Sequence, residues 1–379
     1  MDSMIDNWEK ILGIKKIGRI FIAATRQNVG KTTISLGLIS ALGKKQFKKI
    51  GFIKPVGQRY LMEDGYKVDE DSVLMDRIFK FEFSLHYMSP VAVERGYTEK
   101  FLDGKDTLNA ADRIKDAFEH IKEGKDLVVI EGTGHAGVGS VFDLSNGAVA
   151  KLLNSKVILV SPGGIGNAID EIMLNKSVFD RQNVRLAGVI VNKVRPDKYD
   201  KVDRYVRKGL KRLGIPVLGV IPYVEILDIP TLHDLREELD MHVLCGEKYL
   251  DRQMKRILVG AMEAKEAEQY IENDCLVITP GNRGDLINLV IKVHTGRFKE
   301  PRRVAGLILS GGRAPKRRLY NSLKKAGIPT LMSRLGTYEV ASRVHDLTVK
   351  IKYRDKNKVK MAMDLVERYV DIDQIIRNL

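Results

Sequence analysis

The segment AATRQNVGKTT, residues 23–33, has the residue types of a phosphate-binding loop. It follows an apolar run and opens a helical pattern, and backbone N–H groups at such a helix N-terminus bind phosphate oxygens. In this interpretation Gly30 allows close backbone approach, Lys31 reaches the β- and γ-phosphates, and the Thr32 hydroxyl ligates Mg²⁺. The alternative is a basic helix N-terminus after a turn. We expect the nucleotide to lie against Thr25, Gln27, Asn28, Val29, Gly30, Lys31, Thr32 and Thr33.

Carboxylates should lie opposite this loop, because Mg²⁺ prefers oxygen ligands. Glu131 ends the apolar run DLVVIEG, and Gly132 and Gly134 leave room for a substrate beside it. It stands where a metal-ligating or water-activating acid belongs. Asp71, in KVDEDSVLM, is a second candidate, although a helix N-cap explains its position equally well.

Three further polar residues have two readings each. Lys54 ends the second apolar run and is either a phosphate ligand or a solvated strand end. Asn192 ends LAGVIVN and either recognises a purine base through its amide or belongs to an ordinary turn. His135, in a glycine-rich loop, is a general base or, as such histidines more often are, a hydrogen-bonding structural residue.

The elements that would position these residues alternate between short apolar runs and helical patterns, which is typical of βαβ units and a parallel sheet. Ligands of such sheets bind beyond the carboxyl ends of the strands. After residue 230 the alternation restarts on a smaller scale, and residues 357–370 form an amphipathic helical pattern. The expected strands of the first part start at Arg19, Lys49, Asp126, Lys156, Leu186 and Pro216, and those of the second part at Arg256, Cys275, Val304 and Pro329.

Composition narrows the class of protein. The 379 residues include 64 Lys and Arg against 49 Asp and Glu, a net charge of +15 that is mostly spread along the chain. Residues 297–303 and 313–318 are the best local support for a nucleic-acid role. Such charge suits nucleic acid, anionic lipid or phosphate-rich ligands, but no nucleic-acid-binding module accompanies it. Cys245 and Cys275 are too few and too isolated for a disulfide framework or a zinc site. No apolar run is long enough to span a membrane and the N-terminus lacks a signal-peptide pattern, so we expect a cytoplasmic protein.

Several motifs occur in the order seen in dethiobiotin synthetase, and the chain resembles that family over residues 18–230. Thr25 in place of the first P-loop glycine also matches that family. The resembling segments are residues 25–32, Lys54-Pro55-Val56, Asp71, Glu131-Gly132-Thr133-Gly134, Asn192 and Gly219-Val220-Ile221-Pro222.

The segment EGTGHAGVGS is similar to the N-terminal region of long-form phosphotransacetylases. The second part resembles the DRTGG domain that follows the P-loop domain there, with Asn282 where that domain usually has Asp. The resemblance implies an α/β chain with a P-loop NTPase-type parallel sheet flanked by helices and a smaller C-terminal α/β domain. We place the P-loop domain at residues 1–230, the DRTGG-like domain at 231–348 and a C-terminal strand/helix extension at 349–379. No room is left for an acetyltransferase domain, so acetyl transfer is not expected.

The resemblance further implies ATP and Mg²⁺ as cofactors and a homodimer. Catalysis would fall to Lys31, Lys54 and Glu131, the metal to Thr32, Asp71 and Glu131, and further nucleotide contacts to Asn192 and Pro222. We expect an ATPase or ATP-dependent ligase-type enzyme that acts on an unidentified carboxylate or carbamate. The alternative is a non-catalytic protein that senses a nucleotide through its DRTGG-like domain. A nucleic-acid or scaffold role rests on the net charge alone.

Overall fold

The computed structural model describes residues 17–105, 109–297, 302–347 and 349–379. The chain divides into two compact units. The first consists of the residues up to Val224 together with Ile351–Leu379, and the second of Glu225–Lys350.

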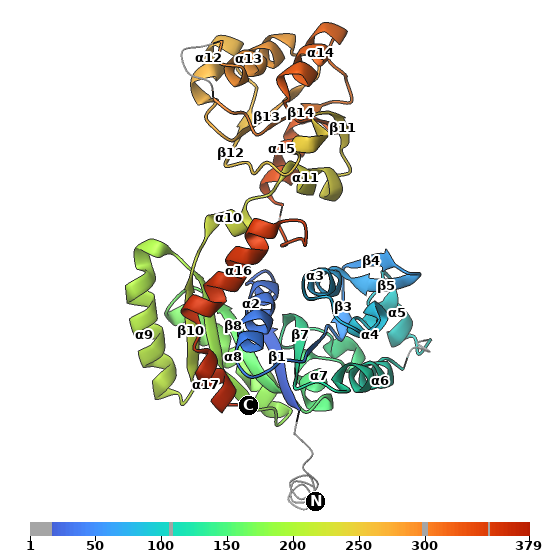
Figure 1. The fold of residues 1–379 in the computed structure, drawn as a ribbon, viewed down its shortest axis with the longest axis vertical. Helices are drawn as coiled ribbons and strands as arrows, with labels where there is room; N and C mark the ends of the chain where they lie inside the picture. Colours follow the sequence, from blue (N-terminus) through green and yellow to red (C-terminus); the bar gives the residue numbers. More distant parts are fainter. Residues whose placement is uncertain (1–16, 106–108, 298–301, 348) are drawn as a thin grey trace, which may run out of the picture. The chain divides into compact units, whose positions relative to one another are not determined.

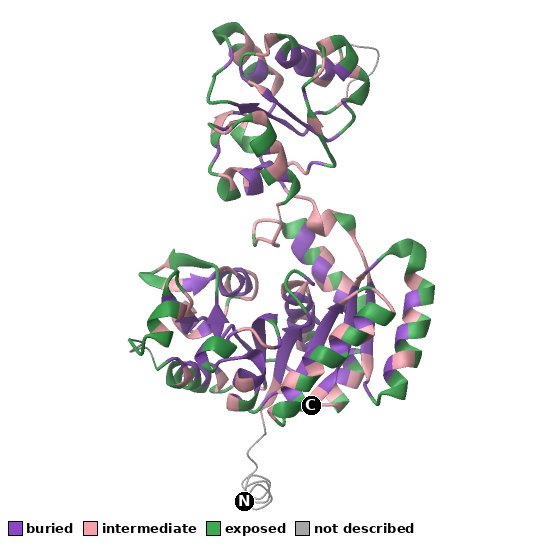
Figure 2. Cartoon of the chain, turned by 180° about the vertical axis from the view of Figure 1, so that it is seen from behind, coloured by how far each residue is buried: buried purple, intermediate pink, exposed green. Residues whose placement is uncertain are grey.

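A six-stranded parallel sheet forms the centre of the first unit (Figure 1). Its strand order is β10-β9-β8-β1-β7-β2, so β1 lies in the middle and the P-loop leaves the sheet from its interior. Nearly every strand residue is buried (Figure 2), because helices cover both faces, and this explains the continuous apolar runs. The six strands confirm the expected ones: β1 (Gly18–Ala24), β2 (Ile50–Ile53), β7 (Leu127–His135), β8 (Lys156–Pro162), β9 (Leu186–Val194) and β10 (Val217–Pro222).

Helices lie in front of the sheet in both Figure 1 and the opposite view of Figure 2. Helices separate the strands, as the alternating pattern of the sequence predicts. The helices of the first unit are α2 (Lys31–Lys44), α3 (Glu70–Phe79), α4 (Leu85–Met88), α5 (Tyr97–Leu102), α6 (Ala110–Lys122), α7 (Asn146–Leu152), α8 (Gly166–Arg181), α9 (Tyr199–Arg212), α16 (Lys356–Tyr369) and α17 (Ile372–Arg377).

Two small sheets follow β2, which the sequence analysis did not anticipate. Strands β3 (Val56–Gly57) and β6 (Val91–Ala92) pair in parallel, and β4 (Tyr60–Glu63) pairs antiparallel with β5 (Tyr66–Asp69). The two-residue turn Asp64-Gly65 has positive φ at both positions, 50° and 83°, which is the geometry that a tight hairpin requires. The second strand of this hairpin ends at Asp69, and α3 begins at the next residue.

The chain returns to the first unit after the second one. Helix α16 packs along α2, and Asp371 N–H donates to the carbonyl of Leu218 on β10 at 2.7 Å. The contact is close because Gly37, in the middle of α2, has no side chain: a Cβ there would lie 2.2 Å from the Cβ of Val366. Residues 351–379, which the sequence analysis set apart as an extension, therefore contribute to the first unit's core.

The second unit is a smaller α/β layer with the strand order β11-β15-β14-β13-β12. Four strands are parallel and β11 runs antiparallel to β15. The four expected strands are confirmed, and β11 was not anticipated. Its strands are β11 (His242–Cys245), β12 (Arg256–Val259), β13 (Cys275–Pro280), β14 (Gly306–Ser310) and β15 (Thr330–Met332), and its helices are α10 (Glu225–Asp228), α11 (Leu232–Glu238), α12 (Ala264–Ala267), α13 (Gly284–His294), α14 (Arg317–Ala326) and α15 (Thr337–His345).

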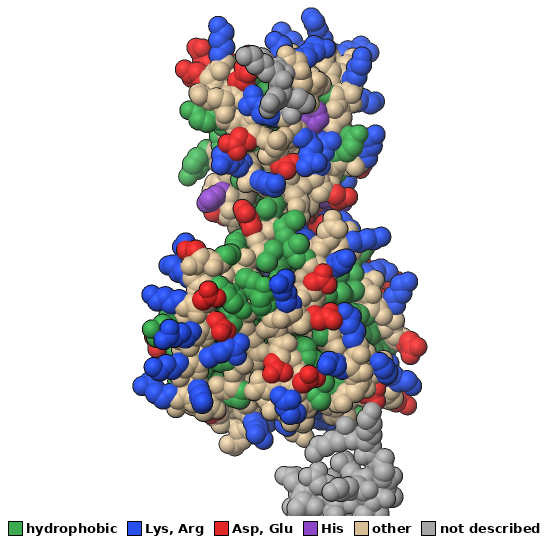
Figure 3. Space-filling view, turned by 60° about the vertical axis from the view of Figure 1, so that its left-hand side comes forward, with side chains coloured by type: hydrophobic (Ala, Val, Ile, Leu, Met, Phe, Trp, Pro, Cys, Tyr) green, Lys and Arg blue, Asp and Glu red, His purple; other side chains and the backbone are tan. Residues whose placement is uncertain are grey.

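Two surface properties bear on function. Lys and Arg side chains are scattered over both units on the face that Figure 3 shows, in line with the dispersed charge of the sequence. Among the described residues, no helix has the length and apolar character that a membrane crossing demands.

The contact between α2 and α16 gives a stability prediction. Gly37→Ala should destabilise the protein by about 1–3 kcal/mol, because the added methyl overlaps Val366. Gly43→Ala in the same helix is the matched control, since the nearest atom to its added methyl is 4.0 Å away. That variant should gain up to about 1 kcal/mol from helix propensity. Urea unfolding of both variants measures the difference; equal stabilities would contradict the close packing.

Candidate phosphate site

The P-loop runs from the end of β1 to the start of α2. Gly30 caps α2 with φ 98°, and a Cβ at this position would lie 2.3 Å from Nδ2 of Asn192. Asn192 is buried on β9, and its Nδ2 donates to the carbonyl of Val29 at 2.8 Å. The amide that we expected at a purine base is therefore engaged by the loop itself. A glycine and an asparagine 162 residues further along thus fix the end of the loop together.

The start of the loop is held by α8. The buried hydroxyl of Thr25 donates to Oε2 of Glu171 at 2.9 Å, and Nδ2 of Asn175 donates to the Thr25 carbonyl at 3.1 Å. Gln27 and Asn28, between these two anchors, are exposed. Sequence reasoning missed Glu171 and Asn175; their spacing of four residues places both on one helix face, but nothing local linked that face to the loop.

Two predicted residues at the start of α2 point toward β7. Lys31 is buried and its ammonium donates to the carbonyl of Gly134 at 3.1 Å. The Thr32 hydroxyl donates to Oε1 of Glu131 at 3.1 Å, and Thr33 is half-buried beside it. The structure therefore brings the predicted P-loop lysine and threonine to the predicted acid.

The ammonium of Lys54 lies inside a cluster of three carboxylates. It contacts Asp71 and lies 3.4 Å from both Oδ1 of Asp69 and Oε1 of Glu131. All four side chains are at most 6% exposed. A solvated strand end is thereby ruled out for Lys54. Asp69 was missed by sequence reasoning: it is the residue that caps α3, accepting from Asp71 N–H at 3.0 Å, so the N-cap reading belongs to Asp69.

Burial and neighbouring charges shift the pKa values of Lys54 and Glu131 in opposite directions. Burial alone would lower the pKa of Lys54, but Asp71, Asp69 and Glu131 outweigh it and hold that pKa well above its usual value. Burial raises the pKa of Glu131, and Lys54 only partly offsets this. Lys54 therefore stays charged at neutral pH, while Glu131 is a carboxylate held in an unfavourable environment.

One carboxylate oxygen of Glu131 is not engaged by Thr32 or Lys54. This oxygen, Oε2, is buried and makes no hydrogen bond of ordinary geometry within the described residues. The hydroxyl of Ser35 lies close enough to Glu131 to lower its pKa slightly, although it too makes no hydrogen bond of ordinary geometry within the described residues. The described residues contain no preformed set of three or more His, Cys, Asp or Glu ligands. The oxygen donors of Thr32, Asp71 and Glu131 nevertheless fit a divalent cation in kind, and Lys54 is the cation they surround in this structure.

The glycine-containing end of β7 is fixed by Asn146. Its Oδ1 accepts from Thr133 N–H at 3.1 Å, and its Nδ2 donates to the carbonyls of Thr133 and His135 at 2.8 and 2.7 Å. The ring Nδ1 of the exposed His135 accepts from Gly137 N–H at 3.2 Å. This turn contact favours the structural reading of His135 over the general base.

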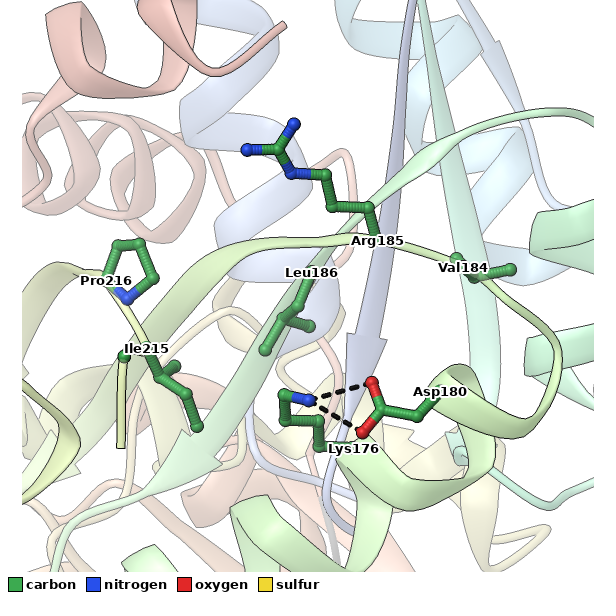
Figure 4. A pocket seen from close by; sticks show the side chains of 8 residues that line it. Lys176, Asp180, Val184, Arg185, Leu186, Ile215 and Pro216 are labelled. Carbon is green, nitrogen blue, oxygen red and sulfur yellow. Dashed lines mark hydrogen bonds and ion pairs between the residues drawn. The ribbon is translucent and has the colours of Figure 1, made fainter. Parts of the chain in front are cut away.

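The remaining features lie away from this cluster. Pro222 ends β10, at the same edge of the sheet as the P-loop but beyond β9 and β8. A small hollow at the opposite edge, where β9 and β10 begin, is crossed by the ion pair of Lys176 and Asp180 (Figure 4). No predicted site residue lines it.

The two parts of the chain each match a known domain family. Residues 18–231, more than half of the chain, match the family model AAA_26, described as an AAA domain. The chain belongs to this AAA domain family. Residues 234–347 match the DRTGG domain, so the expected succession of a P-loop domain and a DRTGG domain is confirmed.

Relatives of this AAA and DRTGG chain include phosphate acetyltransferases. The chain is 28% identical over 365 residues to the phosphate acetyltransferase of Pseudomonas putida, covering 93% of this chain and 50% of that protein. Against the phosphate acetyltransferase of Synechocystis the identity is 26%, with 95% and 51% covered. The chain therefore spans about half the length of these relatives. A plasmid partition protein from Borrelia burgdorferi bound to AMPPNP is a structural neighbour with 17% identity, a TM-score of 0.38 and 56% and 90% of the two chains covered.

The lysine inside the carboxylate cluster should be essential for stability. Lys54→Met leaves three buried carboxylates without their cation, and we expect a loss of roughly 3–5 kcal/mol at pH 7. The loss should shrink at pH 5, because protonation of the carboxyls relieves the repulsion. Urea unfolding at both pH values measures it. Lys67→Met, which removes an exposed ion pair with Glu94, is the control and should change little. An equally mild effect of Lys54→Met would contradict the cluster.

Removal of the Glu131 charge, unlike removal of the Lys54 charge, should stabilise the protein at neutral pH. Because its folded pKa lies above the ordinary value of 4.5, its contribution is present below that pH and is lost as pH rises through the folded pKa. Ionisation of the buried Glu131 lowers the free energy of unfolding of the wild type, and Gln cannot ionise. Glu131→Gln should therefore become more stable relative to the wild type as pH rises from about 4.5 to 7.5. Thermal unfolding of both proteins across this range checks the sign; a gain that grows toward low pH would show that the pKa is depressed instead.

Proposed function

We propose that the first unit binds Mg²⁺-ATP and transfers or releases its γ-phosphoryl group, with a carboxylate or carbamate as the acceptor. The observation that carries the proposal is the meeting of the Thr32 hydroxyl and the Lys54 ammonium at Glu131. The Thr32 hydroxyl and the Lys54 ammonium both contact its Oε1, and its Oε2 is buried without a hydrogen-bond partner among the described residues. A buried carboxylate with a raised pKa and a free oxygen is costly unless a ligand uses it.

Each residue has a role that follows from its position. The loop from Thr25 to Gly30 and the N-terminus of α2 present backbone N–H groups to the phosphates. Lys31 and Lys54 supply two buried positive charges close to Glu131, and in this proposal they neutralise charge on the transferred phosphoryl group. A bound Mg²⁺ would supply charge neutralisation at the phosphate oxygens, with Thr32, Asp71 and Glu131 as the residues to hold it.

An acceptor carboxylate would be drawn to the same charges. Lys54 directly follows β2, at the carboxyl edge of the sheet, which is where ligands of such sheets bind. In this proposal Lys54 exchanges one set of anionic partners for another when substrates bind. The exchange keeps a buried charge paired at every stage, which is why a lysine rather than a neutral residue suits the position.

The second candidate is a regulatory protein that binds nucleotide without turnover. It is supported by the DRTGG domain and by the match to about half of each phosphate acetyltransferase, an arrangement in which an ATP-binding unit would serve a larger protein. The two candidates share ATP binding and differ in turnover. We also propose a homodimer, on the resemblance to dethiobiotin synthetase alone, and sedimentation equilibrium would test it.

The deciding experiment is ADP release from Mg²⁺-ATP by the full chain, with and without added carboxylates. Turnover should fall at least a hundredfold in Lys31→Ala and in Glu131→Gln, because each removes a charge that acts on the transferred group. Glu119→Gln, an exposed glutamate on α6, is the matched control for the second variant and should retain full activity.

The outcomes separate the two candidates. Tight ATP binding with equal, negligible turnover in wild type and variants would favour the regulatory protein over the enzyme. Binding that is unaffected by Lys31→Ala would refute the phosphate site itself.

A further inference from the structure

The carboxyl edge of the second unit's sheet brings two loops together. Gly312 N–H donates to the carbonyl of Ser333 at 2.8 Å, and Gly311 N–H to that of Leu335 at 2.8 Å. The hydroxyls of Ser310 and Thr337 are hydrogen bonded at 2.8 Å. The loops that follow β14 and β15 are thus tied side by side. Open α/β sheets bind ligands at this edge.

The segment from β14 to the loop after β15 is strongly basic. Residues 306–334 contain seven Lys and Arg and no Asp or Glu. All seven side chains are exposed, and none makes an ion pair or a side-chain hydrogen bond within the described part of the chain. They are Arg313, Lys316, Arg317, Arg318, Lys324, Lys325 and Arg334.

The carboxylates nearby do not neutralise this charge. Asp285, in the first turn of α13, forms a bidentate pair with Arg283 at 2.9 and 2.7 Å. Glu339, in the first turn of α15, pairs with Arg343 at 2.7 Å. Each acid is thus paired with an arginine of its own segment. The seven basic side chains form an exposed region of one charge sign, which attracts anions.

An aromatic ring completes the edge. Tyr338 is 86% exposed in the first turn of α15, four residues after Arg334. An exposed ring of this size is a flat surface on which a nucleobase can stack. Arg313 directly follows Gly311 and Gly312, and a Cβ on Gly312 would lie 3.7 Å from the Cα of Arg334, so the two arginines leave the backbone close together.

We propose that this edge is a second anion site, separate from the P-loop, which binds the phosphate groups of a nucleotide through Arg313, Lys316 and Arg334 while Tyr338 stacks on its base. Guanidinium groups pair bidentately with phosphate, and arginine is suited to this role for that reason. The shared chemistry is phosphate, which a nucleotide or an inorganic polyphosphate can supply. The site does not depend on the function proposed for the first unit.

The test uses the full chain carrying Lys31→Ala, which removes the P-loop's contribution. Isothermal titration with ATP at about 0.1 M salt should detect binding in this background. Adding Arg313→Ala and Arg334→Ala should weaken it at least about tenfold, since two charge-assisted contacts are lost. The matched control adds Lys324→Ala and Lys325→Ala instead. It removes the same charge from the last turn of α14, about 10 Å along the helix from Lys316, and should change the affinity less than twofold.

Further arms identify the ligand. Tyr338→Ala should weaken ATP binding and leave the binding of tripolyphosphate unchanged. If ATP and tripolyphosphate bind with equal affinity and Tyr338→Ala has no effect, the ligand is not a nucleotide, and an inorganic polyphosphate is the ligand instead. If the arginine and lysine double variants lose equal affinity, the site is refuted, because general charge then explains the binding. If neither ATP nor tripolyphosphate binds in the Lys31→Ala background, the site is also refuted. A failed turnover assay in the first unit affects none of these readouts.

Discussion

The pairing of Lys54 with three carboxylates is the constraint on which the first unit's site depends. Asp69, Asp71 and Glu131 come from a hairpin end, a helix start and a central strand, and none of them could be buried together without a cation. The cluster therefore couples the small sheets after β2 to the main sheet. It also explains how an acid and a lysine can be held within reach of the P-loop threonine before any ligand arrives.

The P-loop is supported from both sides by residues distant in sequence. Asn192 on β9 holds its last residues, and Glu171 and Asn175 on α8 hold its first. Helix α2, which starts at the loop, is in turn packed by α16 across Gly37. Because the chain passes through the second unit before α16 forms, the segment that covers α2 is continuous with that unit.

The two units differ in how charged side chains are arranged at the carboxyl edge of their sheets. Both place loops at the carboxyl edge of a parallel sheet, where strand ends converge. In the first unit the charges at that edge are buried and balance one another around Glu131. In the second unit they are exposed, of one sign, and left unbalanced by the described residues. A self-neutralised buried cluster suits chemistry on a small group, whereas an exposed basic edge suits reversible binding of an anion.

The sequence by itself determined the parallel sheets, the P-loop and the family, because these depend on local signals. Continuous apolar runs mark strands buried on both faces, and Gly30-Lys31-Thr32 after such a run marks a phosphate loop. It also singled out Lys54, Asp71 and Glu131 one by one. Only the tertiary structure decided that these three meet, that Asp69 joins them, and that Asn192 and Glu171 serve the loop. Those contacts join residues separated by up to 163 positions, and no local pattern encodes which distant side chain will fill a given buried position.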